Sequence, residues 1–229
     1  MKTNTTIKKT IDLRYLLVGV FLSMGALLFI PVLKIAASFN LPLWNLIDTM
    51  GSSFVLSLRS PELTFVMKAI SWWGYYGTVF LWIAVGYLFY KRKKFATLCV
   101  VLALSIGGTA LGFGMKQVIQ RERPVSQALI QEINSSFPSM HVLSTTVLYI
   151  SLVYFLYLYT HKFFVSTLMM FLAIMLIFLM GFSRMYLGVH YLSDCIAGVF
   201  AGLGYLFIIL GLSHLRSAIN KSLIFSKRH

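Results

Sequence analysis

Acidic residues are scarce in this sequence of 229 residues: there are six, and charged residues of either sign make up only 11% of the chain. A soluble domain has about 25% charged residues, because its surface must be hydrated. This chain could not cover such a surface, and its mean hydropathy of +0.83 agrees with that. The composition predicts an integral membrane protein, and the length favours a single membrane-embedded domain over residues 1–229.

Cysteine is also rare, and both Cys99 and Cys195 lie in apolar segments. Neither their number nor their spacing fits a zinc site or a disulfide framework. Basic residues are abundant, with a formal net charge of +14, but they form short clusters between apolar runs. No basic helix with interleaved exposed aromatics is present, as nucleic-acid binding would favour. The clusters are typical of proteins that contact anionic lipid headgroups in a bilayer.

Six apolar runs are long enough to cross a hydrocarbon core, which takes about 20 helical residues. The predicted fold is therefore all-α, a polytopic bundle of six transmembrane helices. A mixed segment after the first run predicts a loop with a short interfacial helix. The first run follows a basic leader and is too long for a signal-peptide core, so we expect a retained anchor. The predicted spans are residues 15–36, 68–90, 95–117, 141–160, 163–183 and 190–212.

The distribution of basic residues predicts the orientation of these spans. With the N-terminus in the cytoplasm, thirteen of the twenty Lys and Arg residues lie on the cytoplasmic side, including the run 91–94. Cytoplasmic loops carry such an excess in membrane proteins. We therefore expect both termini in the cytoplasm of a bacterium, the protein in its plasma membrane, and the outer span ends on the extracytoplasmic face.

Several polar residues gather at the outer ends of the last four spans. Ionisable residues at membrane depth are costly and usually functional. All of these span ends emerge on one side, so a single pocket could collect three cations, two histidines, a hydroxyl and a carboxylate. The seven polar residues are Lys116, Arg123, Ser139, His141, Arg184, His190 and Asp194, and Met140 lies between Ser139 and His141 as part of the same candidate site.

Phosphoryl transfer is the chemistry that needs such a set, because phosphate oxygens require fixed positive charge and hydrogen-bond donors. Lys116, Arg123 and Arg184 supply the charge. Ser139 and backbone N–H groups at the start of the fourth span add donors. His190 and Asp194 are four residues apart and would share a helix face, so Asp194 could hold one ring nitrogen and leave the other free as a nucleophile. His141 would protonate the leaving oxygen.

The spacing of these residues resembles the three signature blocks of the type 2 phosphatidic acid phosphatase family. The blocks are Lys116-x6-Arg123-Pro124, then Pro138-Ser139-x-His141, then Ser183-Arg184-x5-His190-x3-Asp194. That family includes bacterial phosphatidylglycerophosphate and undecaprenyl pyrophosphate phosphatases. The resemblance implies that His190 is the nucleophile, Asp194 its partner and His141 the acid, while the three cations and Ser139 bind phosphate. Met140 departs from the family, which usually has glycine there for close backbone approach.

The resemblance implies a lipid phosphatase that needs neither metal nor cofactor, since Asp194 is the only carboxylate in the set. The substrate stays open among undecaprenyl pyrophosphate, phosphatidylglycerophosphate and phosphatidic acid. Two other functions also stay open: a lipid-headgroup transferase, and a non-enzymatic lipid phosphate transporter. Oligomeric state is not predicted. Outside the blocks, we expect Arg121 and Glu122 in a solvated loop, and Asp48 and Glu62 facing water.

Overall fold

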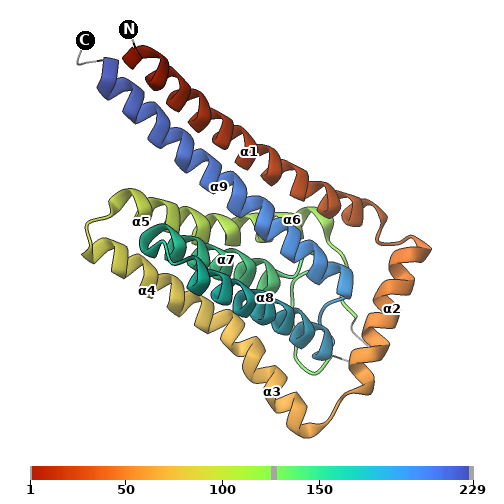
Figure 1. Cartoon of the computed structure of the whole chain (residues 1–229). Helices are drawn as coiled ribbons and strands as arrows, with labels where there is room; N and C mark the ends of the chain where they lie inside the picture. The colour runs from red at the N-terminus through yellow and green to blue at the C-terminus, as the bar shows by residue number, and fades with distance from the viewer. Residues whose placement is uncertain (1, 125–127, 227–229) are drawn as a thin grey trace.

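The computed structural model describes residues 2–124 and 128–226, and helices account for most of them. Figure 1 follows them from the N-terminus to the C-terminus. Five helices are long and apolar enough to cross a membrane within the described residues, and a sixth predicted span coincides with a continuous helical stretch, α3–η1–α4. The elements are α1 (Lys2–Ser38), α2 (Pro42–Ser57), α3 (Pro61–Trp72), η1 (Trp73–Gly77), α4 (Thr78–Lys91), α5 (Phe95–Leu102), η2 (Ala103–Gly107), α6 (Gly108–Ile119), α7 (Met140–Thr160), α8 (Phe163–Tyr186) and α9 (Leu192–Ser226).

The prediction of an all-α, multi-span fold is confirmed. Two of the predicted spans contain a π-helical turn, η1 between α3 and α4 and η2 between α5 and α6. Such turns insert an extra residue into an α-helix and often lie at functional sites. In η1, a Cβ on Gly74 would lie 2.2 Å from Met180 Cε and 3.4 Å from His141 Cδ2. The glycine therefore lets this span approach α7 and α8 closely.

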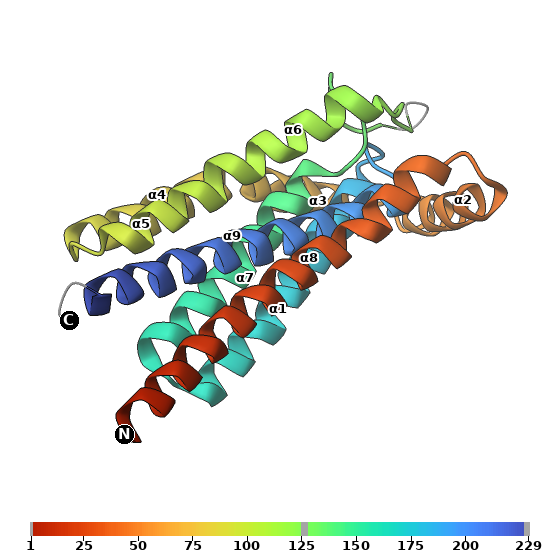
Figure 2. The same cartoon turned by 90° about the horizontal axis from the view of Figure 1, so that it is seen from above.

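Helices α7, α8 and α9 form the centre of the bundle, and α1 runs along α9 (Figures 1 and 2). The α7–α9 contact depends on Gly198 and Gly202, where a Cβ would lie 2.8 Å from the Ser139 carbonyl oxygen and 3.0 Å from that of Leu143. Small residues spaced four apart permit such close helix packing in membranes. The two glycines therefore let α7 and α9 pack closely together.

The predicted helix between the first two spans is α2, which crosses one end of the bundle from α1 to α3 (Figure 1). Its outward side exposes large apolar side chains, whereas Asp48 and Val55 are buried against the bundle. The start of α1 and the end of α9 lie at the opposite end of the molecule (Figure 1). The loop between α6 and α7 and the turn between α8 and α9 lie at the α2 end.

Candidate active site

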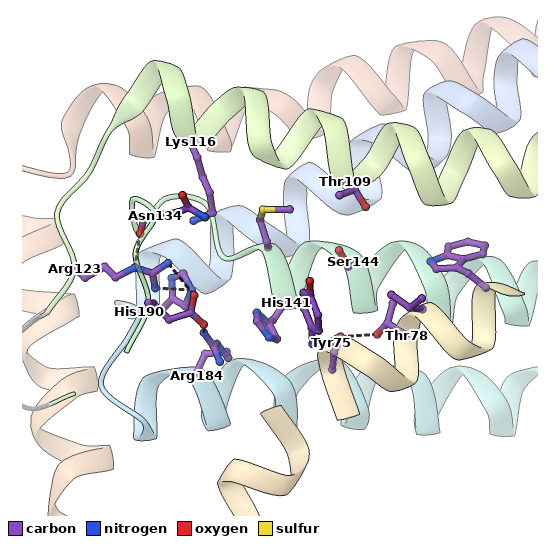
Figure 3. A pocket seen from close by; sticks show the side chains of 15 residues that line it. Tyr75, Thr78, Thr109, Lys116, Arg123, Asn134, His141, Ser144, Arg184 and His190 are labelled. Carbon is purple, nitrogen blue, oxygen red and sulfur yellow. Dashed lines mark hydrogen bonds and ion pairs between the residues drawn. The ribbon is translucent and has the colours of Figure 1, made fainter. Parts of the chain in front are cut away.

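A cavity of about 270 Å³ opens where α6, α7, α8 and η1 meet near the α2 end of the bundle. Five of the six predicted site residues with ionisable side chains line it: Lys116, Arg123, His141, Arg184 and His190. Figure 3 shows their side chains converging from separate elements. Met140 also lines the cavity, whereas Ser139 and Asp194 are fully buried behind its wall.

The turn between α8 and α9 presents His190 to the cavity. Gly188 takes a left-handed conformation with φ 72°, which favours glycine, and the N–H of Val189 returns to the Arg184 carbonyl at 3.2 Å. Helix α9 begins only at Leu192, so His190 lies before the helix rather than on its face. The expectation of a shared helix face is therefore wrong, yet the turn still brings His190 Nδ1 to 3.4 Å from Asp194 Oδ2.

The two ring nitrogens of His190 have different neighbours. Nδ1 faces Asp194, and Nε2 lies 3.4 Å from an Arg123 guanidinium nitrogen on the cavity side. The pKa of His190 lies well below its ordinary value, and burial of the ring is the largest cause. The nearby charges of Arg184, Arg123 and Lys116 lower this pKa further. The imidazole is thus neutral at neutral pH, which a nitrogen nucleophile requires.

Loop residues 134 and 135 hold two of the cations at the cavity rim. Arg123 donates to the Asn134 carbonyl at 2.5 Å and to the Val189 carbonyl at 2.8 Å. Lys116 donates to the Ser135 carbonyl, while Ser135 Oγ donates back to the Lys116 carbonyl at 3.0 Å. These bonds fix the positive groups before any phosphate binds, so little reorganisation is needed.

Glu132 belongs to the cavity although sequence reasoning missed it. Its carboxylate pairs with the buried Arg184 and lies 3.7 Å from Arg123. Arg184 also donates to Ser71 Oγ at 2.5 Å. The two carboxylate oxygens of Glu132 therefore occupy positions in which phosphate oxygens could bind the same two guanidinium groups. The available signal was that Glu132 is one of only six acidic residues and lies between two signature blocks.

Behind His190, the expectations for Arg121 and Asp48 are wrong. Arg121 is 7% exposed and Asp48 is 3% exposed, so neither faces water. Arg121 bonds to Asp194 Oδ1 at 2.6 Å and to Asp48 Oδ2 at 2.7 Å. Asp194 Oδ2 accepts the Tyr191 N–H at 2.9 Å, which caps the start of α9. A buried guanidinium requires carboxylate partners, and the positions of those partners could not be read from the sequence.

Charge in the cavity matches a doubly charged phosphate. Lys116, Arg123 and Arg184 contribute three positive charges and Glu132 removes one, which leaves an excess of two. Guanidinium groups and a lysine at fixed positions are the usual partners of phosphate oxygens. Within the described part of the chain, no group of three or more His, Cys, Asp or Glu side chains is placed to hold a metal ion.

An apolar groove of about 610 Å³ continues from this cavity along the side of the bundle. The groove and the cavity share Val79, Trp82, Thr109 and Met140 as lining residues. Its walls come from α4, η2, α6 and the first residue of α7. Figure 3 shows Thr109 lying away from the cationic end of the cavity. A phosphate in the cavity could therefore be joined to an apolar chain in the groove.

An all-α membrane bundle with this cationic, histidine-containing cavity has the architecture of an integral membrane phosphohydrolase. The comparison with family models agrees: residues 95–217 match the PAP2 superfamily, which is more than half of the chain. The chain belongs to the PAP2 superfamily and is a membrane lipid phosphatase.

Known relatives extend the match beyond the family region. Phosphatidylglycerophosphatase B of Bacillus subtilis is 31% identical over 194 residues, which cover 80% of this chain and 92% of that protein. The crystal structure of the PAP2-type phosphatidylglycerolphosphate phosphatase from Bacillus subtilis matches with a TM-score of 0.74 at 28% identity, covering 82% of this chain and 94% of that one. Aquifex aeolicus LpxE matches with a TM-score of 0.55 at 20% identity over 74% and 94%, a likeness of fold alone.

Proposed function

We propose that this protein hydrolyses the phosphate monoester of a membrane glycerophospholipid, with phosphatidylglycerophosphate as the first candidate, through a phosphohistidine at His190. The observation that carries the proposal is the cavity with two excess positive charges that opens into an apolar groove. A lipid phosphate monoester has this shape and charge: a dianionic head on acyl chains. The 31% identity to a phosphatidylglycerophosphatase B supports that substrate over the alternatives.

In the proposed first step, His190 Nε2 attacks phosphorus and the bond to the lipid oxygen breaks. His141, which lines the same cavity, gives a proton to the leaving alkoxide. Lys116, Arg123 and Arg184 stabilise the charge on the equatorial oxygens. The proton on Nδ1 stays on the ring, which becomes positive as the P–N bond forms, and the Asp194 carboxylate, 3.4 Å from Nδ1, stabilises that charge. In the second step, water gives a proton to His141 and attacks phosphorus, and inorganic phosphate leaves as the P–N bond breaks.

Purified full-length protein in detergent micelles tests this proposal. The substrates are phosphatidylglycerophosphate, phosphatidic acid and undecaprenyl pyrophosphate, with release of inorganic phosphate as the readout. We expect phosphatidylglycerophosphate to have the highest kcat/KM, and activity to persist in excess EDTA. After rapid quenching in alkali, phosphohistidine survives whereas a carboxyl phosphate is hydrolysed, so the two phosphoenzymes can be distinguished. His190→Ala should remove both the phosphoenzyme and turnover.

Five results would contradict the proposal. Normal turnover by His190→Ala, or a phosphate trapped on His141, would remove His190 from its role. Consumption of lipid without release of phosphate would indicate a transferase, and binding without any chemistry would indicate a transporter. Complete loss of activity in EDTA, restored by magnesium or zinc, would exclude the metal-free mechanism.

We further propose that the cavity faces the outside of the plasma membrane. The end of the bundle that contains both chain ends also receives the basic run 91–94, as the cytoplasmic side should. A cysteine at Ile133, which is fully exposed, should react with an impermeant thiol reagent in intact cells, whereas one at Lys93 should not. Both are introduced after Cys99→Ser, since Cys99 is exposed. The reverse labelling pattern would place the site inside.

A further inference from the structure

Behind His190, a buried polar cluster joins the crossing helix α2 to the start of α9. We define the carboxylate cluster as Asp48, Arg121, Ser193 and Asp194. Arg121 bonds to Ser193 Oγ at 2.7 Å as well as to both carboxylates. Asp48 accepts the Ser193 N–H at 2.9 Å and the Ser193 hydroxyl at 2.7 Å. Every member is buried, and every ionised member has a charged partner.

Two aromatic rings hold the Arg121 guanidinium in place. Its central carbon lies 4.8 Å from the centre of the Phe39 ring and 4.3 Å from that of Tyr191. Cation–π contacts of this kind favour a desolvated arginine. Arg121 thus contacts two aromatic rings and bonds to three side chains, those of Ser193, Asp194 and Asp48. These contacts position the Asp194 oxygen that Arg121 binds.

The charge of this cluster is opposite to that of the substrate cavity. Two carboxylates and one guanidinium leave a net charge of −1. A neutral His190 does not compensate that charge, but the phosphohistidine does, because its ring is positive while phosphate is attached. The negative cluster therefore stabilises the phosphohistidine intermediate more than the enzyme with a neutral His190. An interaction that is stronger as the reaction proceeds than at its start accelerates the formation of that intermediate.

We propose that Arg121 and Asp48 are positioning residues of the phosphatase reaction: Arg121 orients Asp194 behind His190, and Asp48 keeps the cluster negative so that it stabilises the positive ring. Neither residue touches the substrate cavity. The inference rests on the proposed phosphohistidine at His190. It gives α2 a part in catalysis, because Asp48 is the α2 residue that reaches the cluster.

The acid limb of the kcat profile against pH tests this proposal, because protonation of His190 removes the nucleophile. Arg121→Gln removes a positive charge, which raises the pKa of His190 and should move the acid limb to higher pH by about one unit. Asp48→Asn removes a negative charge, which lowers the pKa of His190 and should move the acid limb to lower pH by a similar amount. The charged groups that face His190 stay in place in both variants; they are Lys116 of α6, His141 of α7, Arg184 of α8, Arg123 and Glu132 of the α6–α7 loop, and Asp194 of α9.

Rates give a second readout. Asp48→Asn should lower kcat about tenfold with KM nearly unchanged, in line with the usual effect of partners one contact removed from the reacting group. Arg121→Lys keeps the charge and should retain the parental limb. The double variant Asp48→Asn with Arg121→Gln should return the limb close to the parent, because the two charge changes cancel. Glu62→Gln, on the exposed start of α3, is the matched control.

The inference is wrong if the two single variants keep the parental kcat and acid limb. It is also wrong if they lose activity while the limb stays fixed, since that result indicates a structural role alone. Asp48→Asn keeps an oxygen for the Ser193 N–H and is nearly isosteric, so its folding should survive; a melting curve checks this. Active His190→Ala would overturn the proposed function instead, and the two failures are thereby distinguished.

Discussion

His190 lies between two regions of opposite charge. On the cavity side, three cations outweigh Glu132 and leave a net charge of +2; on the other side, two carboxylates outweigh Arg121 and leave −1. Both regions are charged and largely buried, yet they suit different species. The cavity suits an anionic substrate, whereas the carboxylate cluster matches the positive ring of the proposed phosphohistidine. Separate regions allow binding and chemistry to be tuned independently.

Of the substitutions that test this comparison, the replacement of Arg184 in the cavity should have the largest effect on kcat/KM. Arg184 is 1% exposed and joins Ser71 Oγ to Glu132 through its guanidinium group. Arg184→Lys keeps the charge but loses the planar fork that matches phosphate oxygens. We expect kcat/KM to fall about 10²- to 10³-fold, the usual cost of removing one transition-state donor. Steady-state kinetics on the best lipid substrate measure this, and a melting curve shows whether the protein still folds. A change smaller than threefold would contradict the role of the fork.

His141→Ala should separate the two halves of the reaction. The ring lines the cavity and lies 6.1 Å from the Tyr75 ring, between the cations and η1. Without a proton donor, departure of a lipid alkoxide should slow about 10²-fold. A pyrophosphate substrate leaves as a stable phosphate anion and should suffer much less. Rapid-quench measurement of phosphoenzyme formation on both substrates checks this, and equal losses for both would contradict the assignment of His141 as the acid.

These regions differ in how far the sequence predicts them. Lys116, Arg123, Arg184 and His190 belong to spaced blocks, and the helix order that brings them together follows from apolar runs of membrane length. The carboxylate cluster depends on where α2 crosses the bundle, which is a long-range contact between Asp48 and residues more than seventy positions away. Hydropathy contains no information on such a contact. The one signal in the sequence was that Asp48 is one of only six acidic residues; the burial of Asp48 and Arg121 is visible only in the structure.

Local structure also limited the prediction for the site. The sequence suggested that α9 would begin at His190, but Gly188 in its left-handed conformation places a turn there and α9 begins at Leu192. The spacing of four residues between His190 and Asp194 thus brings them together through a turn and a helix cap. The sequence therefore predicted the proximity of His190 and Asp194 correctly from an incorrect local geometry, because both arrangements place the two side chains next to each other.

Glu132→Gln should sharpen the contrast by raising the positive charge of the cavity. In the structure without substrate, Glu132 pairs with Arg184 and lies near Arg123, so an incoming phosphate must displace it. The amide competes less well than the carboxylate for the two guanidinium groups. We therefore expect KM for the lipid and the inhibition constant of inorganic phosphate each to fall about three- to tenfold, which corresponds to roughly 1 kcal/mol of binding free energy. Competition assays with inorganic phosphate measure the inhibition constant. Weaker phosphate inhibition would instead indicate that Glu132 holds the cations in their binding positions.

Met140→Gly should have the smallest effect, because Met140 is apolar and belongs neither to the charged groups around His190 nor to the carboxylate cluster. Its side chain lines both the phosphate cavity and the apolar groove, and it packs against Gly112 of α6. Glycine there widens the passage between the two and costs about 1 kcal/mol of helix stability. We expect kcat/KM within about tenfold of the parent, which corresponds to about 1.4 kcal/mol, and weaker discrimination between short and long acyl chains. Kinetics on a chain-length series measure both. Loss of all activity in a folded variant would show that Met140 takes part in the chemistry on the cavity side.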